Sequence, residues 1–130
     1  MFKKHRNDAG FDICCAEDIV IPAAPKKLEV NTGLYVAIPP GCVGEIWPRS
    51  GLSIDFGTQT GAGIVDANYR GEIKVSIYTL EEPLELKAGS RIAQLVVTQL
   101  APFPAVRVGS LSELGDTDRG VNGFGSTGGY

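Results

Sequence analysis

Apolar and polar side chains alternate strictly in three stretches of the chain. The apolar members are Phe11, Ile13 and Cys15, then Leu34, Val36 and Ile38, and finally Ile73, Val75 and Ile77. A period of two residues is that of a β-strand with one buried face, because successive side chains of a strand point to opposite sides. The pattern therefore predicts three half-buried strands.

Turn-forming residues separate these stretches at short intervals. Proline, glycine and asparagine gather at 22–25, 31–33, 39–41, 82–83 and 87–89. This spacing is typical of an antiparallel barrel or sandwich. No stretch carries a long helical stripe, and the two short helical candidates, 50–56 and 110–114, could not organise a core. We predict an all-β fold.

Composition narrows the class of protein. A chain of 130 residues, 43% of them hydrophobic, suits one globular domain. No apolar run approaches the ~20 residues that span a bilayer, so no membrane partner is expected. The net charge is −3 and the basic residues are scattered, which argues against a nucleic-acid surface. The charged start lacks the apolar stretch of a secretory signal, so we expect an intracellular protein, cytoplasmic or nuclear.

The three cysteines of the chain predict neither disulfide bonds nor a metal site. Cys14 and Cys15 are adjacent and Cys42 stands alone. This arrangement provides neither paired disulfides nor the Cys-x-x-Cys spacing of a zinc site, so we interpret all three as reduced.

The last twelve residues differ from the rest of the chain, with five glycines among them. Glycine-rich termini are commonly disordered. Here, however, glycine amides, the hydroxyls of Ser126 and Thr127 and the guanidinium of Arg119 could together surround an anion. Phe124 offers a flat face on which a base can stack. We predict a tail that is mobile when empty and becomes ordered over a triphosphate.

A second cluster follows the apolar run that ends at Trp47. Pro48 ends the strand and Gly51 permits a tight turn. Arg49, Ser50 and the Gly51 amide can then face one phosphate. The alternative is structural, with Ser50 as the N-cap of a short helix.

A third cluster covers residues 61–72. Asp66 and Tyr69 stand three residues apart in a polar turn, so both can project into one cavity. An aspartate there is commonly a turn residue, but the only histidine lies in the charged terminus, and a carboxylate can serve as a general base. Asp12 is the other candidate acid. The carboxylates are too dispersed for an all-protein metal cage, so Mg²⁺ would arrive with a triphosphate.

Together, five segments resemble the five motifs of the trimeric deoxyuridine triphosphatases (dUTPases) in order and spacing. The segments are 8–13 (DAGFDI), 48–52 (PRSGL), 61–71 (GAGIVDANYRG), 89–94 (GSRIAQ) and 119–128 (RGVNGFGSTG). One such motif alone would be weak support. Five in the same order, over nearly the whole chain, form a specific resemblance.

The resemblance implies a single-domain, distorted β-barrel of jelly-roll type. Residues 1–118 would form the core and 119–130 a flexible arm that closes over the substrate. It also implies a homotrimer with three sites at subunit interfaces, where one chain supplies motifs one, two and four, another motif three, and the last the arm. The implied reaction cleaves dUTP to dUMP and pyrophosphate by water attack on the α-phosphorus, which keeps uracil out of DNA and supplies dUMP for thymidylate synthesis.

Each residue role is carried over by position. Asp66 would orient the attacking water, and Asp12 would contact Mg²⁺ through water. The uracil and the deoxyribose would be bound by Gly63, Ile64, Val65, Tyr69, Lys74 and Phe124, with Tyr69 packed under the sugar. The phosphates would be bound by Arg49, Ser50, Gly51, Gln94, Arg119, Gly125, Ser126 and Thr127.

Three features of this chain depart from the family pattern and affect how far the residue roles can be carried over. The strand that usually precedes the first motif is short here, which affects trimer packing most. Ser90 replaces a common aspartate, which removes a charge and could soften the orientation of Arg49. Asn68 replaces an acid found in many members, and we expect little effect because Asp66 is intact.

Two rival functions remain open. The related dCTP deaminases share the fold, but use a glutamate where this chain has Ser76. A non-catalytic module could instead sense dUTP and signal through its tail, although a pure binder has no need for Asp66.

Overall fold

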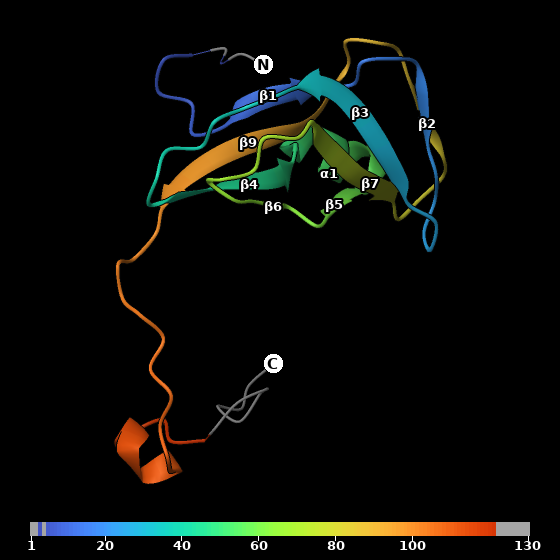
Figure 1. The fold of residues 1–130 in the computed structure, drawn as a ribbon. Coiled ribbons are helices and arrows are strands. Elements are labelled where there is room, and N and C mark those ends of the chain that lie inside the picture. The colour runs from blue at the N-terminus through green and yellow to red at the C-terminus, as the bar shows by residue number, and fades with distance from the viewer. Residues whose placement is uncertain (1–2, 4, 122–130) are drawn as a thin grey trace.

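The computed structural model describes residue 3 and residues 5–121. Strands dominate this part of the chain (Figure 1). The elements are β1 (Phe11–Cys14), β2 (Ile19–Ile21), β3 (Leu28–Leu34), β4 (Cys42–Pro48), α1 (Ser50–Phe56), β5 (Thr58–Gly61), β6 (Ile64–Val65), β7 (Ile73–Thr79), β8 (Leu84–Leu86), β9 (Arg91–Gln99) and the 3₁₀ helix η1 (Leu111–Leu114). The all-β prediction is confirmed.

The strands form three antiparallel sheets in a jelly-roll-like arrangement. The largest has the order β1-β9-β4-β6, a second has β3-β7-β5, and β2 pairs with β8. Strands β4 and β9 form the longest ladder, from the pair Cys42–Gln99 to the pair Pro48–Ala93. On its other side β9 pairs with β1, so the N-terminal strand lies at the edge of the sheet beside the last strand of the described chain.

The core follows from the alternation in the sequence. Ile73, Val75 and Ile77 of β7 are buried, as are Ile92 and Leu95 of β9. They pack in one continuous apolar cluster between the sheets. Because removal of apolar surface from water is the main favourable term in folding, these strands hold the domain together.

The second predicted strand is partly wrong. Strand β3 ends at Leu34, and residues 35–39 belong to no strand. Ile38 is nevertheless buried, with 4% of its surface exposed. Pro39 and Pro40 follow directly and have no N–H to donate to a ladder. The alternation at 34–38 therefore reflects burial without strand pairing.

Both short helices lie where the sequence predicts them. α1 ends at Gly57, which adopts the left-handed conformation and donates its N–H to the Leu52 carbonyl. Arg49 occupies the N-cap position without a side-chain capping bond, and Ser50 is the first helical residue. The interpretation of Ser50 as the N-cap is therefore wrong, and no capping bond occupies its hydroxyl.

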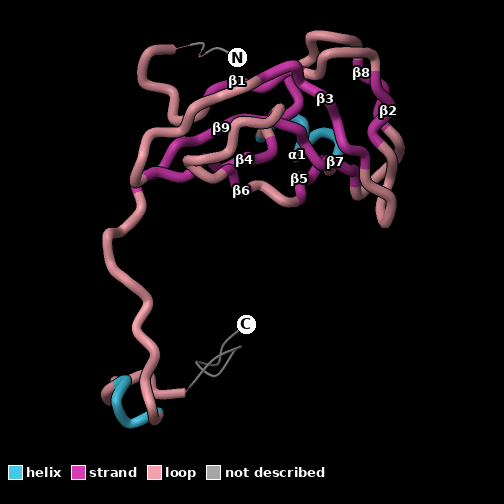
Figure 2. Tube along the Cα trace, viewed as in Figure 1, coloured by secondary structure: helices cyan, strands magenta, loops and turns pink. Residues whose placement is uncertain are grey.

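After β9 the chain runs away from the strands (Figures 1 and 2). In residues 100–121 only η1 is regular, closed by a capping box between Ser110 and Glu113. Phe103 and Leu111 are among its exposed apolar side chains. A division of the chain at residue 118 stays a prediction. Within the described ranges, no helix has the length and apolar character needed to cross a membrane.

Removal of buried apolar volume should destabilise this fold. Ile77 is fully buried in β7, whereas Ile54 of α1 is 80% exposed. We expect Ile77→Ala to lower the free energy of unfolding by about 2–5 kcal/mol, because it leaves a cavity. The chemically matched Ile54→Ala should stay within about 0.5 kcal/mol of the wild type. Urea denaturation at one protein concentration measures both, and equal losses would contradict this core.

Candidate active site

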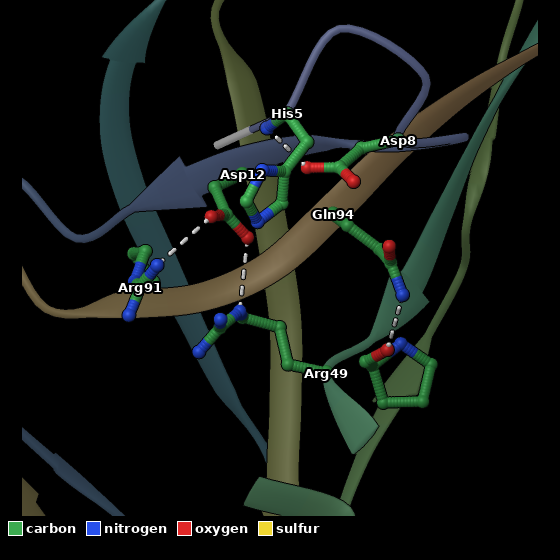
Figure 3. A network of polar contacts seen from close by, with 7 residues as sticks. His5, Asp8, Asp12, Arg49, Arg91 and Gln94 are labelled. Carbon is green, nitrogen blue, oxygen red and sulfur yellow. Dashed lines mark hydrogen bonds and ion pairs between the residues drawn. The ribbon is translucent and has the colours of Figure 1, made fainter. Parts of the chain in front are cut away.

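The first half of the site forms where β1, β9 and β4 lie side by side. In the ladder register, Gln94 of β9 is opposite Asp12 of β1 on one side and Trp47 of β4 on the other. Directly opposed residues share a face of the sheet. Arg49 follows as β4 ends, so segments far apart in the sequence converge on one row (Figure 3).

The Asp12 carboxylate binds two arginine side chains at this row. Arg49 Nε donates to Asp12 Oδ1 at 2.9 Å, and Arg91 Nη1 donates to Asp12 Oδ2 at 3.3 Å. Asp12 has 17% of its side-chain surface exposed, so solvent screens these pairs less than it would at the surface. Although Ser90 lacks the charge of an aspartate, Arg49 therefore has a carboxylate that fixes it.

A cavity of about 300 Å³ lies over this row. Its lining residues are His5, Asp8, Ala9, Gly10, Asp12, Arg49, Arg91 and Gln94. Gln94 Nε2 donates to the Pro48 carbonyl at 3.1 Å. A Cβ at Gly10 would lie 2.5 Å from Gln94 Oε1, so a larger residue here would displace the end of the Gln94 side chain. Ser50 and Gly51 begin α1 beside Arg49 but do not line the cavity.

The turn that leads into β9 is fixed by Asp18. The Asp18 carboxylate accepts from Lys87 Nζ at 2.8 Å and from the Ala88 N–H at 2.9 Å. The hydrogen bond from Lys87, followed by that from Ala88, lowers the pKa of Asp18. Gly89 has a φ of +83° in the same turn, a conformation that favours glycine. The start of the strand that carries Arg91 is therefore well defined.

The second half of the site is the segment 62–69, which contains β6 and the turn after it. Ile64 pairs with Glu45 of β4. The Gly63 carbonyl accepts the Ile46 N–H at 2.7 Å. A Cβ at Gly63 would lie 2.6 Å from the Ile46 carbonyl oxygen. No side chain fits there, so the backbone at residue 63 lies directly against β4.

Asp66 and Tyr69 line one cavity, as their spacing predicts. The Tyr69 N–H donates to the Asp66 carbonyl, and the Tyr69 hydroxyl donates to the Glu72 carbonyl, both at 3.1 Å. The cavity has a volume of about 280 Å³. It is lined by Glu29, Ile46, Ala62, Ile64, Val65, Asp66, Tyr69, Glu72, Ile73, Lys74 and Ser76.

Lys74 is tied to an acid inside this cavity. Its Nζ donates to Glu29 Oε1 at 2.7 Å. The hydrogen bond and then the charge of Glu29 raise the pKa of Lys74, and Glu72 adds to the effect. Glu29 had no place among the predicted site residues, because its approach to Lys74 depends on the pairing of β3 with β7.

The two cavities share no lining residue. One chain therefore does not bring Asp66 together with Arg49 or Gln94. Arg119 is exposed and lines neither cavity. Phe124, Gly125, Ser126 and Thr127 lie outside the described residues.

Metal ligands are sparse in the described ranges. No group of three or more histidine, cysteine, aspartate or glutamate residues there could hold a metal ion. Asp12 and Asp8 are the carboxylates of the cavity that Arg49 and Arg91 line, which we call the phosphate-side cavity after the role that the family resemblance implies for it. Such a donor set suits a divalent cation that keeps most of its water and its substrate ligands.

Fold and cavities together define a class: a small all-β domain with an arginine-bearing cavity on one sheet and, beside it, a second cavity lined by an aspartate and a tyrosine. The family model described as dUTPase matches residues 1–128. The chain belongs to the dUTPase family.

Similar proteins come from several kinds of organism. The deoxyuridine 5'-triphosphate nucleotidohydrolase of Corynebacterium jeikeium is 45% identical over 130 residues, which cover 97% of this chain and 83% of that protein. The protein of the same name from Paramecium bursaria Chlorella virus 1 is 46% identical over 121 residues, covering 92% and 83%.

Solved structures agree in fold. The Staphylococcus bacteriophage 80alpha dUTPase, determined with dUPNHPP, superposes with a TM-score of 0.85 at 28% identity, covering 97% of this chain and 89% of that one. The dUTPase of S. aureus phage phi11, described with a structural Mg(II) ion, gives a TM-score of 0.75 at 24% identity, covering 85% and 89%.

The contact between Lys74 and Glu29 leads to a prediction about the pKa of Lys74. We expect Glu29→Gln to lower the pKa of Lys74 toward its ordinary value, as seen by NMR titration of the lysine side chain. Because the folded-state pKa is raised, the pair stabilises the fold below the ordinary lysine pKa and loses this effect as pH rises through the folded-state value. Glu85→Gln, at an exposed position on β8, is the control. An unchanged Lys74 titration in Glu29→Gln would contradict the contact.

Proposed function

We propose that this chain hydrolyses dUTP to dUMP and pyrophosphate, by attack of water on the α-phosphorus. The reaction would keep uracil out of DNA and supply dUMP for thymidylate synthesis. Membership of the dUTPase family supports dUTP as the substrate. The observation that carries the chemistry is that Asp66 and Tyr69 line one cavity beside β6.

Asp66 is the general base of this proposal. Its carboxylate orients the water and accepts its proton as the oxygen attacks phosphorus; pyrophosphate leaves on the opposite side. Tyr69 packs under the deoxyribose. Since its hydroxyl is bound to the Glu72 carbonyl, the ring has a fixed position and leaves no space for a 2′-hydroxyl.

The β6 segment reads the uracil edge in this account. Gly63, Ile64 and Val65 present backbone groups, and the contact between Gly63 and Ile46 holds this segment firmly against β4. A rigid polar frame rejects a base whose donors and acceptors are differently placed, because its own buried groups would then stay unpaired. Lys74 and Phe124 complete the pocket for base and sugar.

The Asp12–Arg49 side holds the phosphates. Arg49 and Gln94 contact them, joined by Ser50 and the Gly51 amide at the start of α1. Mg²⁺, when bound, neutralises phosphate charge, and Asp12 contacts it through water. From the arm, Arg119, Gly125, Ser126 and Thr127 close over the phosphates.

A complete site requires more than one copy. Because the cavities share no lining residue, we propose a homotrimer in which one chain supplies Arg49 and Gln94, its neighbour Asp66, and the last the arm. Trp47 and Ile64 are 52% and 67% exposed and line one further hollow, which shares Ile64 with the Asp66 cavity. Large exposed apolar side chains of this kind mark association surfaces. Residues 1–118 would form the core and 119–130 the arm.

Deamination of dCTP is the weaker alternative. Ser76 lines the Asp66 cavity at the position where the deaminases carry a glutamate. A serine hydroxyl does not replace a carboxylate as an acid–base group at neutral pH.

Product analysis with four nucleotides tests the reaction. We expect pyrophosphate release from dUTP, stimulated by Mg²⁺, and little release from UTP, dTTP or dCTP. Ammonia from dCTP without pyrophosphate from dUTP would establish the deaminase instead.

The Asp66 carboxylate should be needed for turnover and not for binding. We expect Asp66→Asn to bind dUTP with nearly wild-type affinity while kcat falls about 10²- to 10⁴-fold, the usual contribution of a general base. Asp55→Asn, at an exposed position of α1, is the matched control and should keep full activity. Normal hydrolysis by Asp66→Asn would refute the base assignment, and wild-type binding without hydrolysis would favour the sensing module.

A further inference from the structure

The only histidine of the chain lies in the phosphate-side cavity. From its position in the sequence, His5 belongs to a charged terminus without a role. In the structure it lines the cavity together with Arg49, Arg91 and Gln94. Figure 3 shows its imidazole directed from the N-terminal turn toward Asp12 and Arg49.

A closed turn fixes the backbone of His5. Its N–H donates to Asp8 Oδ2 at 2.8 Å, and the Asp8 N–H donates to the His5 carbonyl at 3.2 Å. These two bonds fold the segment back toward β1, the strand that contains Asp12. Asp8 is thus a positioning residue for His5.

The cavity needs donors beyond its arginines. It contains two guanidinium groups and two carboxylates, whose formal charges cancel. Both oxygens of Asp12 accept from these arginines, and Gln94 Nε2 already donates to the Pro48 carbonyl. A triphosphate brings several negative charges and many acceptor oxygens. An imidazole adds one N–H donor when neutral and two when protonated.

We propose that His5 is a further substrate-binding residue, whose imidazole donates a hydrogen bond to the phosphate chain beyond the α-phosphate. The inference rests on the proposed function. Asp66, the group that acts at the α-phosphorus, lies in the other cavity, so a phosphate beside His5 is one that leaves with the pyrophosphate. His5 therefore holds the substrate and takes no proton from the water.

Two substitutions of His5 distinguish a hydrogen bond to the substrate from a purely structural role of the side chain. His5→Leu removes the donor, and His5→Gln retains one. Arg6→Gln is the control, because Arg6 is exposed, adjacent and absent from the cavity lining, yet carries a full charge. Calorimetry measures binding of a non-hydrolysable imido analogue of dUTP and of dUMP, and steady-state kinetics gives KM and kcat.

We expect His5→Leu to bind the analogue about tenfold more weakly, the loss typical of one hydrogen bond to a charged group. Its affinity for dUMP should not change, KM should rise, and kcat should stay near the wild-type value. His5→Gln should lie closer to the wild type, and Arg6→Gln should match it. The same thermal unfolding midpoint in all variants excludes a folding defect. If His5→Leu is unstable, His5→Ala, which also removes the donor, takes its place.

Three results would overturn the inference. They are unchanged analogue affinity in His5→Leu, equal weakening of dUMP and analogue, and equal weakening by Arg6→Gln. If the wild type neither binds nor cleaves dUTP, the proposed function fails, and titration with inorganic tripolyphosphate then decides on His5 alone. If the wild type binds tripolyphosphate and His5→Leu binds it about tenfold more weakly, the phosphate contact is supported. Equal binding by both proteins, or no binding by the wild type, refutes it.

Discussion

The site depends on the pairing of β9 with both β1 and β4. This ladder places Asp12, Gln94 and Trp47 in one row, so that the Asp12 carboxylate reaches Arg49 at the end of one strand and Arg91 at the start of another. A slip of one residue would turn every side chain to the opposite face. The buried Ala93 and Leu95, which flank Gln94 and point to the other face of β9, oppose such a slip because it would expose them. The core thereby fixes the polar row.

The same sheet keeps the two cavities apart. In the order β1-β9-β4-β6, the arginine cavity lies over the β1 side and the segment of Asp66 lies at the β6 edge, with β4 between them. Rigidity on each side is local: ion pairs hold the arginine cavity, and the close contact of Gly63 with Ile46 holds β6 against β4. Neither half can move toward the other without breaking the sheet, so catalysis in this account requires association of identical chains.

Local features could be predicted from the sequence, and long-range contacts could not. The alternation at Ile73, Val75 and Ile77 predicts β7, and a three-residue spacing predicts the shared cavity of Asp66 and Tyr69. The same alternation fails before Pro39, since burial does not require pairing. The turn at 48–51 predicts a phosphate role for Arg49, whereas the role of Gln94 came only from the order of the family motifs. The ion pairs of Asp12, the Glu29–Lys74 contact and the turn that places His5 arise from the tertiary structure.

Complementation between two inactive variants tests the divided site most directly. Asp66→Asn and Arg49→Ala each disable one half, so each variant alone should be nearly inactive with dUTP. Equal amounts of the two chains, unfolded and refolded together, should regain about one quarter of the wild-type activity, because in a closed ring of chains about one interface in four joins two intact halves. Activity no greater than that of the separate variants would contradict the account.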